Sequence, residues 1–174
     1  MGRNTKSCLA TCQCGKAAVE ITGAPILSTA CYCDTCQAAG HEFEQVDGAP
    51  RTVGDDGGTE YCLFRKDRVR VALGGEHLRE HWLTPDSKTR RVLATCCNTP
   101  MFLDFTPGHW LCVYRSRLPA GAPPPQMRVY TSDRPAGVTL PSDIPNYPTH
   151  SPKFMARLLL SWAAMGFRRP KVTW

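Results

Sequence analysis

The sequence contains no run of eighteen apolar residues, and its opening stretch, MGRNTKSCLATCQCG, holds no apolar segment of signal-peptide length. We therefore expect no membrane span and no secretion, and we predict a cytoplasmic protein. Lys6 occupies the position where an N-myristoylation motif requires serine or threonine, so we expect no lipid anchor. The chain also has no internal repeat, which excludes a solenoid or a repeat array.

Cysteine, in contrast, is plentiful, with ten residues in a chain of 174. In a reducing compartment, cysteines grouped at short spacings indicate metal ligands rather than disulfides. Most of them form three such groups: a C-x-C at Cys12 and Cys14, a C-x-C-x-x-C at Cys31, Cys33 and Cys36, and an adjacent pair at Cys96 and Cys97. The sequence therefore predicts metal binding, and a bound ion would hold distant segments together.

The first group predicts a structural zinc site. Zinc bound by thiolates takes four ligands in a tetrahedron, and a C-x-C corner such as Cys12 and Cys14 supplies two. Cys96 and Cys97 are the natural partners if the chain turns sharply at the NTP segment that follows them. Cys97 is the stronger of the two, because Cys96 could instead be a buried apolar side chain and Cys8 could supply the fourth ligand. Four thiolates also suit iron, although a mononuclear site of this kind favours zinc.

The middle group predicts a reactive site. Cys31, Cys33 and Cys36 lie within six residues, so they can hold one ion and leave a fourth coordination position free. We predict that these three cysteines are catalytic and bind a second zinc ion, which would help to ionise an incoming thiol or water. The alternative is a second structural zinc completed by a histidine or by Cys62 or Cys112, although a buried free thiol is the commoner state of a cysteine within a strand.

Charge and proline divide the chain in two. The formal net charge is +6, but residues 1–114 carry 12 Lys and Arg against 13 Asp and Glu, whereas residues 115–174 carry 9 against 2. Ten of the fifteen prolines also fall in residues 115–174. We predict a zinc-binding domain over residues 1–114 and a proline-rich basic extension over residues 115–174, much of it extended or loop-like.

Segments with strand-like alternation or composition predict a mainly β first domain. In residues 68–73, for example, Val69, Val71 and Leu73 alternate with polar or small residues, which predicts one buried face. The expected strands span residues 16–22, 59–65, 68–73, 76–84, 90–94, 101–105 and 110–114.

The extension is expected to end in one amphipathic helix. Ser151 is a suitable N-cap, Pro152 suits the first helical position, and Gly166 suits the C-terminal end. The apolar residues at helical spacing are Phe154, Met155, Leu158, Leu159, Trp162 and Met165. We expect the helix to dock on the β domain. The alternative is a helix that lies on a membrane surface, anchored by Arg157, Arg168, Arg169 and Lys171.

Three motifs in this order resemble those of the family of glutathione-dependent formaldehyde-activating enzymes and centromere protein V. They are CQCG, CYCDTCQ and CCNTPMF, where the family has C-x-C-G, C-H-C-x-x-C and F-C-x-x-C-G-T-P-L-F. The resemblance covers roughly residues 8 to 105. It implies a β-tent fold, a structural zinc held by Cys12, Cys14 and Cys97, and a zinc at the middle motif that takes the sulfur of glutathione.

The chain departs from the family pattern at three positions. Ala94 stands where a ligand cysteine should be, Asn98 replaces a glycine, and Tyr32 replaces the usual histidine of the middle motif. Cys96 is then the expected replacement ligand of the structural site. The chain resembles a divergent branch of the family.

The leading functional hypothesis is carbon–sulfur lyase-type chemistry on a small thiol adduct, such as a glutathione–aldehyde hemithioacetal. It requires a base that moves the hydroxyl proton, and the candidates are His41, His77, His81 and His109. It also requires cations for the substrate's carboxylates, and the candidates are Arg65, Arg68, Arg70, Arg90 and Arg91.

The alternative hypothesis comes from another class of protein. A non-catalytic, zinc-stabilised binding module could use the basic extension to contact nucleic acid or an anionic surface. We do not expect nucleic acid as a partner, because the extension lacks the dense alternation of aromatic and basic residues of a single-strand platform. The cysteine spacings are also not those of a C₂H₂ finger.

Overall fold

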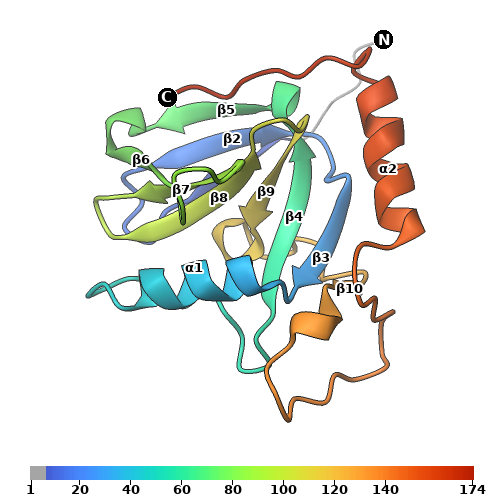
Figure 1. Ribbon diagram of the computed structural model, residues 1–174. Coiled ribbons are helices and arrows are strands. Elements are labelled where there is room, and N and C mark those ends of the chain that lie inside the picture. Colours follow the sequence, from blue (N-terminus) through green and yellow to red (C-terminus); the bar gives the residue numbers. More distant parts are fainter. Residues whose placement is uncertain (1–6) are drawn as a thin grey trace.

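The computed structural model describes residues 7–174, which form two β-sheets and two α-helices (Figure 1). The strands are β1 (Ser7–Thr11), β2 (Ala18–Thr22), β3 (Leu27–Cys31), β4 (Thr59–Arg65), β5 (Val69–Leu73), β6 (Leu78–His81), β7 (Thr89–Ala94), β8 (Thr99–Phe105), β9 (Trp110–Tyr114) and β10 (Arg128–Val129), and the helices are α1 (Asp34–Glu44) and α2 (Pro152–Ala163). The small sheet has the order β1-β2-β5, and the large sheet has the order β10-β3-β4-β9-β8-β7-β6. The expected mainly β architecture is confirmed.

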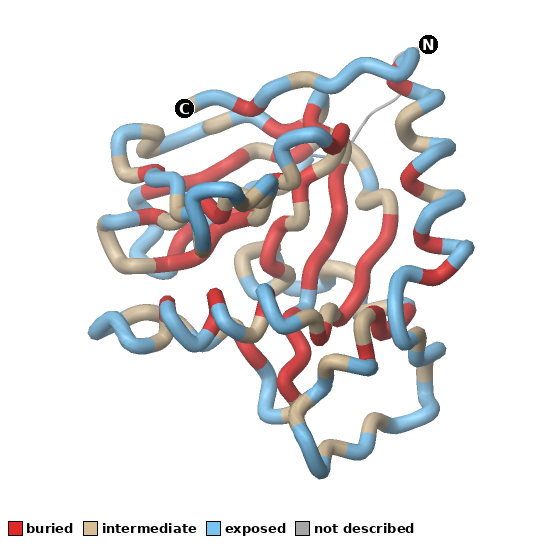
Figure 2. Tube along the Cα trace, viewed as in Figure 1, coloured by how far each residue is buried: buried red, intermediate tan, exposed pale blue. Residues whose placement is uncertain are grey.

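Period-two alternation along the strands gives the large sheet two apolar faces. Cys62 and Phe64 of β4 belong to a buried cluster shared with the small sheet, which contributes Val19 and Ile21 from β2. Tyr61 and Leu63, which alternate with them along β4, belong to a second cluster that includes residues of α2. Figure 2 shows the buried residues concentrated along the central strands of the large sheet.

The C-terminal extension closes the second face. Strand β10 pairs in parallel with β3, placing Val129 beside Cys31. Ser151 caps α2, because its Oγ accepts a hydrogen bond of 3.0 Å from the backbone N–H of Phe154. Phe154 and Leu158 are buried against the sheet, so the predicted docking of this helix is confirmed. The division of the chain at residue 114 stays a prediction.

Several expected strands agree with the structure, and others differ. Strands β4 and β9 have the expected bounds, and β7 and β8 begin one and two residues earlier than expected. The segment 76–84 yields only the short strand Leu78–His81. Leu73 is 55% exposed, so the burial expected from alternation in β5 fades towards its end. On α2, Met155 and Leu159 are also exposed rather than part of the buried stripe.

Helix α1 has no sequence-based prediction, and Gly40 explains why. Glycine lowers helix propensity, so the segment DTCQAAGHEFE is a weak helix by composition. In the fold, the loop after α1 packs directly on Gly40, where a Cβ atom would lie 2.1 Å from Cγ2 of Val53. The glycine therefore serves close packing that only the tertiary structure reveals.

Charged side chains from neighbouring segments of the large sheet form a buried group. The carboxylate of Asp104 forms an ion pair with Lys66 Nζ at 2.7 Å and accepts a hydrogen bond from Arg90 Nε at 2.8 Å. Lys66 and Asp104 are almost fully buried, and Lys66 also donates to the carbonyl of Gly108 at 2.7 Å. Pairing of this kind is required because an isolated buried charge is strongly unfavourable.

Among the described residues, no helix is both long and apolar enough to cross a membrane. The cytoplasmic location stays a prediction.

Candidate metal centres

Four cysteine side chains meet where a turn of the small sheet reaches a turn of the large sheet. The Sγ atoms of Cys12, Cys14, Cys96 and Cys97 all lie within 4.8 Å of one another. The first two residues lie between β1 and β2, and the last two lie between β7 and β8. The structure thus brings together the four residues that the sequence groups, and a metal ion bound there would join the two sheets.

Backbone geometry at both turns directs the thiols to one point. Gly15 has a φ of +76° in the turn after Cys12, a left-handed conformation that favours glycine. Asn98 has a φ of +51°, which asparagine tolerates better than most residues, and it closes the turn that holds the adjacent cysteines. Because the chain is not extended there, Cys96 and Cys97 can both contribute to one group.

The sulfur separations suit a single tetrahedral ion. They are 3.6 Å for Cys12–Cys14, 3.7 Å for Cys12–Cys96, 3.4 Å for Cys14–Cys96 and 3.9 Å for Cys96–Cys97. Zinc–sulfur bonds of about 2.3 Å would place the corners of a tetrahedron about 3.8 Å apart. A disulfide would require about 2.0 Å, and these cysteines are free thiols. Cys8 is not in the group and packs against the adjacent apolar cluster.

The pKa values of the adjacent residues Cys96 and Cys97 shift in opposite directions. Burial acts to raise the pKa of Cys97, but hydrogen bonds from Thr99 and from Cys14 outweigh it and lower that pKa to about 6. Burial and the hydrogen bonds to Cys14 and Cys12 raise the pKa of Cys96. The group therefore carries a thiolate near neutral pH, which is the form that binds metal.

The second group lies where β3 gives way to α1. The Sγ atoms of Cys31, Cys33 and Cys36 lie within 4.8 Å of one another, with Cys31 and Cys33 3.5 Å apart. Cys33 is the N-cap residue of α1, and its carbonyl accepts a hydrogen bond of 2.9 Å from the N–H of Cys36. The first turn of the helix thus folds Cys36 back beside the other two thiols.

These three thiols share negative charge unevenly. Hydrogen bonds from Cys31 and then from Cys36 lower the pKa of Cys33 to about 2. The reciprocal hydrogen bonds to Cys33 and Cys36, together with burial, raise the pKa of Cys31. The N-terminus of α1 also favours a thiolate at Cys33. An anionic trio of soft ligands is suited to a cation such as zinc.

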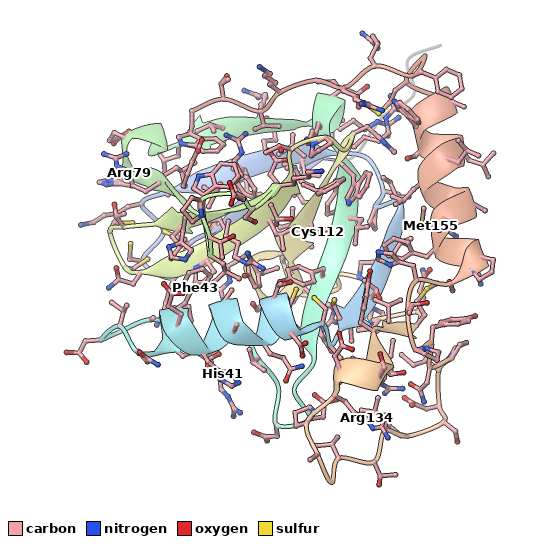
Figure 3. The ribbon with its side chains drawn as sticks, viewed as in Figure 1. His41, Phe43, Arg79, Cys112, Arg134 and Met155 are labelled. Carbon is pink, nitrogen blue, oxygen red and sulfur yellow. The ribbon has the colours of Figure 1, made fainter. Side chains whose placement is uncertain are left out.

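A cavity of about 650 Å³ opens beside the trio. Its walls come from β3, β4, β7, β8, β9, α1 and the C-terminal extension. Five of the lining residues carry aromatic rings, namely Tyr61, Phe105, Trp110, Tyr130 and Phe154. In Figure 3, Cys112 lies over the large sheet and Met155 on α2, and both residues line this cavity. The trio therefore has room beside it for a small ligand.

The histidines proposed as bases lie elsewhere. His41 is exposed on α1 and points away from the sheet in Figure 3, whereas His77 lies in a short turn before β6. His81 contacts Glu42 at 3.3 Å, and Nε2 of His109 lies 2.8 Å from the hydroxyl of Ser161. None of these four residues lines the cavity, so they are wrong as candidate bases for this site.

His150 lines the cavity instead, although the sequence analysis did not single it out. Its ring stacks on Phe154 at a centroid distance of 4.4 Å and packs edge-on against Tyr130 at 4.8 Å. This packing partly desolvates the imidazole and lowers its pKa, so the ring is neutral at pH 7. The proline-rich segment around it gives no local signal, because its place at the cavity depends on long-range packing.

The other residues named from the sequence lie at different places in the fold, and only some of them line the trio's cavity. Arg91 is the one of the five named arginines that lines the cavity, and it is almost fully buried. Tyr32 lines a different cavity, where its hydroxyl donates to Asp56 at 2.6 Å. Cys112 lines the trio's cavity without belonging to the trio, and Cys62 is buried in the cluster on the opposite face.

Comparisons with known proteins leave the family open. No protein-family model matches the chain, and no curated protein matches it either. The crystal structure of a Rhodobacter sphaeroides protein, a structural genomics target, is similar to this chain with 16% sequence identity and a TM-score of 0.47. The similarity covers 67% of this chain and 91% of that one. Membership of the formaldehyde-activating family stays a prediction that rests on the cysteine motifs.

Proposed function

We propose that the protein is a zinc protein related to the glutathione-dependent formaldehyde-activating enzymes and that it performs carbon–sulfur lyase-type chemistry on a small thiol adduct. The difference between the two cysteine groups carries this proposal. Four thiols surround one point in the first group, whereas three thiols face a cavity of about 650 Å³ in the second. That is the contrast between structural and catalytic zinc sites.

The ligand types support zinc at both groups. Both sets consist of sulfur alone, and the sulfur separations in the first group suit tetrahedral coordination. A zinc ion held by three thiolates retains a position for a substrate sulfur and favours the thiolate form of that sulfur. We also propose a β-tent fold for the two sheets.

The proposed reaction cleaves or forms the carbon–sulfur bond of a hemithioacetal. In the cleavage direction, the hydroxyl proton leaves, the C=O bond forms, and the carbon–sulfur electron pair departs with the sulfur as a thiolate. His150 accepts the hydroxyl proton, because it is the histidine of the cavity lining and its lowered pKa keeps it neutral at pH 7. The aromatic residues of the lining lower the local polarity around the reacting carbon.

Metal content and turnover test this proposal together. Protein purified anaerobically without added metal is expected to hold close to two zinc ions per chain by mass spectrometry. Cys33→Ser is expected to hold close to one and to lose turnover of thiol–aldehyde adducts. Cys8→Ser is the matched control, because Cys8 lies outside both groups, and it should retain both properties. Unchanged turnover in Cys33→Ser would contradict the proposed role of the trio.

A second candidate function is supported by exposed apolar residues on α2 and just after it. Leu159, Leu160 and Phe167 are each more than half exposed. Residues 151–174 contain five Lys and Arg and no Asp or Glu. A non-catalytic module could use these residues on an anionic surface.

Deleting the whole extension would not test this alternative, because residues 115–174 supply β10 and α2 to the folded core. Replacing the exposed cations Arg168, Arg169 and Lys171 with glutamine leaves that packing in place. The alternative predicts salt-sensitive binding to anionic vesicles that this triple variant loses. Binding that is unchanged in the variant would contradict it.

A further inference from the structure

Arg91 differs from the other arginines in being buried without a carboxylate partner. It is 1% exposed, and within residues 7–174 it makes no ion pair. Its Nη2 donates to the carbonyl of Thr35 at 2.8 Å, and its buried Nε has no hydrogen-bond partner. The adjacent Arg90 pairs instead with Asp104 and Glu80. Arg91 is thus a buried cation with unused donors.

The unused donors lie close to the trio. Thr35 connects the two, because its carbonyl accepts from Arg91 while its hydroxyl lies 3.3 Å from the sulfur of Cys33. The guanidinium and the sulfur are therefore separated by little more than one residue. A ligand whose sulfur lies at the trio would place an atom only a few bonds away beside Arg91.

The charge of Arg91 acts on the Cys36 thiol and favours its thiolate form, but apart from the trio the described lining residues offer Arg91 no buried carboxylate. Three of the lining residues are Asp or Arg. Arg91 is almost fully buried, whereas Asp34 is exposed and Asp133 is half-buried. The surrounding walls are largely aromatic and aliphatic. A buried guanidinium with a donor left without a partner is costly in such surroundings, so a carboxylate that enters the cavity would gain both charge pairing and hydrogen bonds.

We propose that Arg91 binds the carboxylate of the substrate, and that the site selects small acids with an apolar body rather than a polar peptide such as glutathione. The planar fork of a guanidinium matches a carboxylate in two parallel hydrogen bonds. The aromatic walls suit the apolar body. The inference that the substrate contains sulfur rests on the proposed function, whereas the inference that it contains a carboxylate rests on the surroundings of Arg91.

A pair of matched probes without sulfur tests Arg91 separately from any turnover. Phenylacetate and phenylacetamide have nearly the same shape and differ in charge. We titrate each into the purified full-length protein by calorimetry. The acid is expected to bind at least about tenfold more tightly, as for a hydrogen bond to a charged group. Equal affinities, or no measurable binding of either compound, would overturn the proposal.

Variants then test whether Arg91 is responsible for the preference for the acid. Arg91→Met is expected to abolish the preference for the acid, and Arg91→Lys to weaken it, because lysine keeps the charge but not the fork. Arg79→Met is the control, because Arg79 lies exposed on the neighbouring strand β6 (Figure 3), and it should keep the preference. A preference that survives Arg91→Met would overturn the proposal. If the Arg91 variants fail to fold, equal affinities of the two probes for the unmodified protein would still overturn the proposal.

The two proposals fail in different ways. A protein that turns over thiol–aldehyde adducts but binds the acid and the amide equally would retain the proposed function and refute the role of Arg91. A protein that prefers the acid through Arg91 but contains no second zinc and turns over no adduct would refute the proposed function alone.

Discussion

Replacing Asp104 with asparagine tests the buried charge group directly. The change keeps the shape of the side chain and removes the one negative charge that faces both Lys66 and Arg90. Lys66 is almost fully buried and would keep its carbonyl hydrogen bonds while losing its ion pair. Arg90 would keep its contact with Glu80 at 2.5 Å. The perturbation thus leaves mainly one uncompensated buried charge.

The expected loss follows from the burial of the partners. Removing one member of a buried ion pair destabilises proteins by about 3–5 kcal/mol, because the remaining charge stays desolvated. Glu80→Gln breaks the other ion pair of Arg90, but the Glu80 side chain is 40% exposed. An exposed pair contributes about 0–1 kcal/mol. Each variant removes one carboxylate partner of Arg90. The expected losses of stability differ because Asp104 is buried and Glu80 is not.

Urea denaturation followed by circular dichroism at fixed zinc concentration measures both free energies of unfolding. Asp104→Asn should lose several times more stability than Glu80→Gln. Adding Lys66→Met to Asp104→Asn should recover part of the loss, because it removes the uncompensated charge. Equal losses for the two single variants would refute the reasoning from burial.

Three further predictions concern the metal, a glycine and a histidine. Chelation should lower the melting temperature of the unmodified protein, and Cys14→Ser should lower it in zinc-replete buffer, because the four-thiol group joins the two sheets. Gly40→Ala should cost about 1–3 kcal/mol by urea denaturation despite the higher helix propensity of alanine, since its Cβ would overlap Val53, whereas Ala38→Gly reports propensity alone. Burial lowers the pKa of His109, so stability should fall as pH drops below about 6.5, and His109→Gln should reduce that slope in acid titrations.

Local signals in the sequence were sufficient for the two cysteine groups. The trio lies within six residues, and the helix that Cys33 precedes as its N-cap brings the thiols together without distant contacts. The adjacent pair Cys96 and Cys97 needed a sharp turn, and the NTP segment gave that signal through Asn98. Strands with clear alternation and composition, such as β4 and β9, were predictable for the same reason. Each of these features is encoded within a few neighbouring residues.

Long-range packing determined what sequence reasoning missed. Strand β3 is buried on both faces of the sheet, so its sequence LSTAC shows no alternation of apolar and polar residues. His150 reaches the cavity only because β10 pairs with β3 and α2 packs on the second cluster. Five arginines looked equivalent from their spacing. The register of β7 turns Arg90 towards Asp104 and Arg91 towards the trio's cavity, which no local pattern distinguishes.

The C-terminal extension changes the chemistry that the trio can support. Three thiols at the start of a helix would, on a bare sheet edge, face water and bind any accessible thiol. Here the extension adds β10 beside Cys31 and places Tyr130, Phe154 and Leu158 over the cavity. These apolar walls lower the local polarity and so strengthen any charge pairing with Arg91. A segment that looks like a solvated basic tail by composition therefore supplies part of the cavity lining. If the proposed function holds, substitutions in its aromatic residues should change which ligands bind before they change metal content.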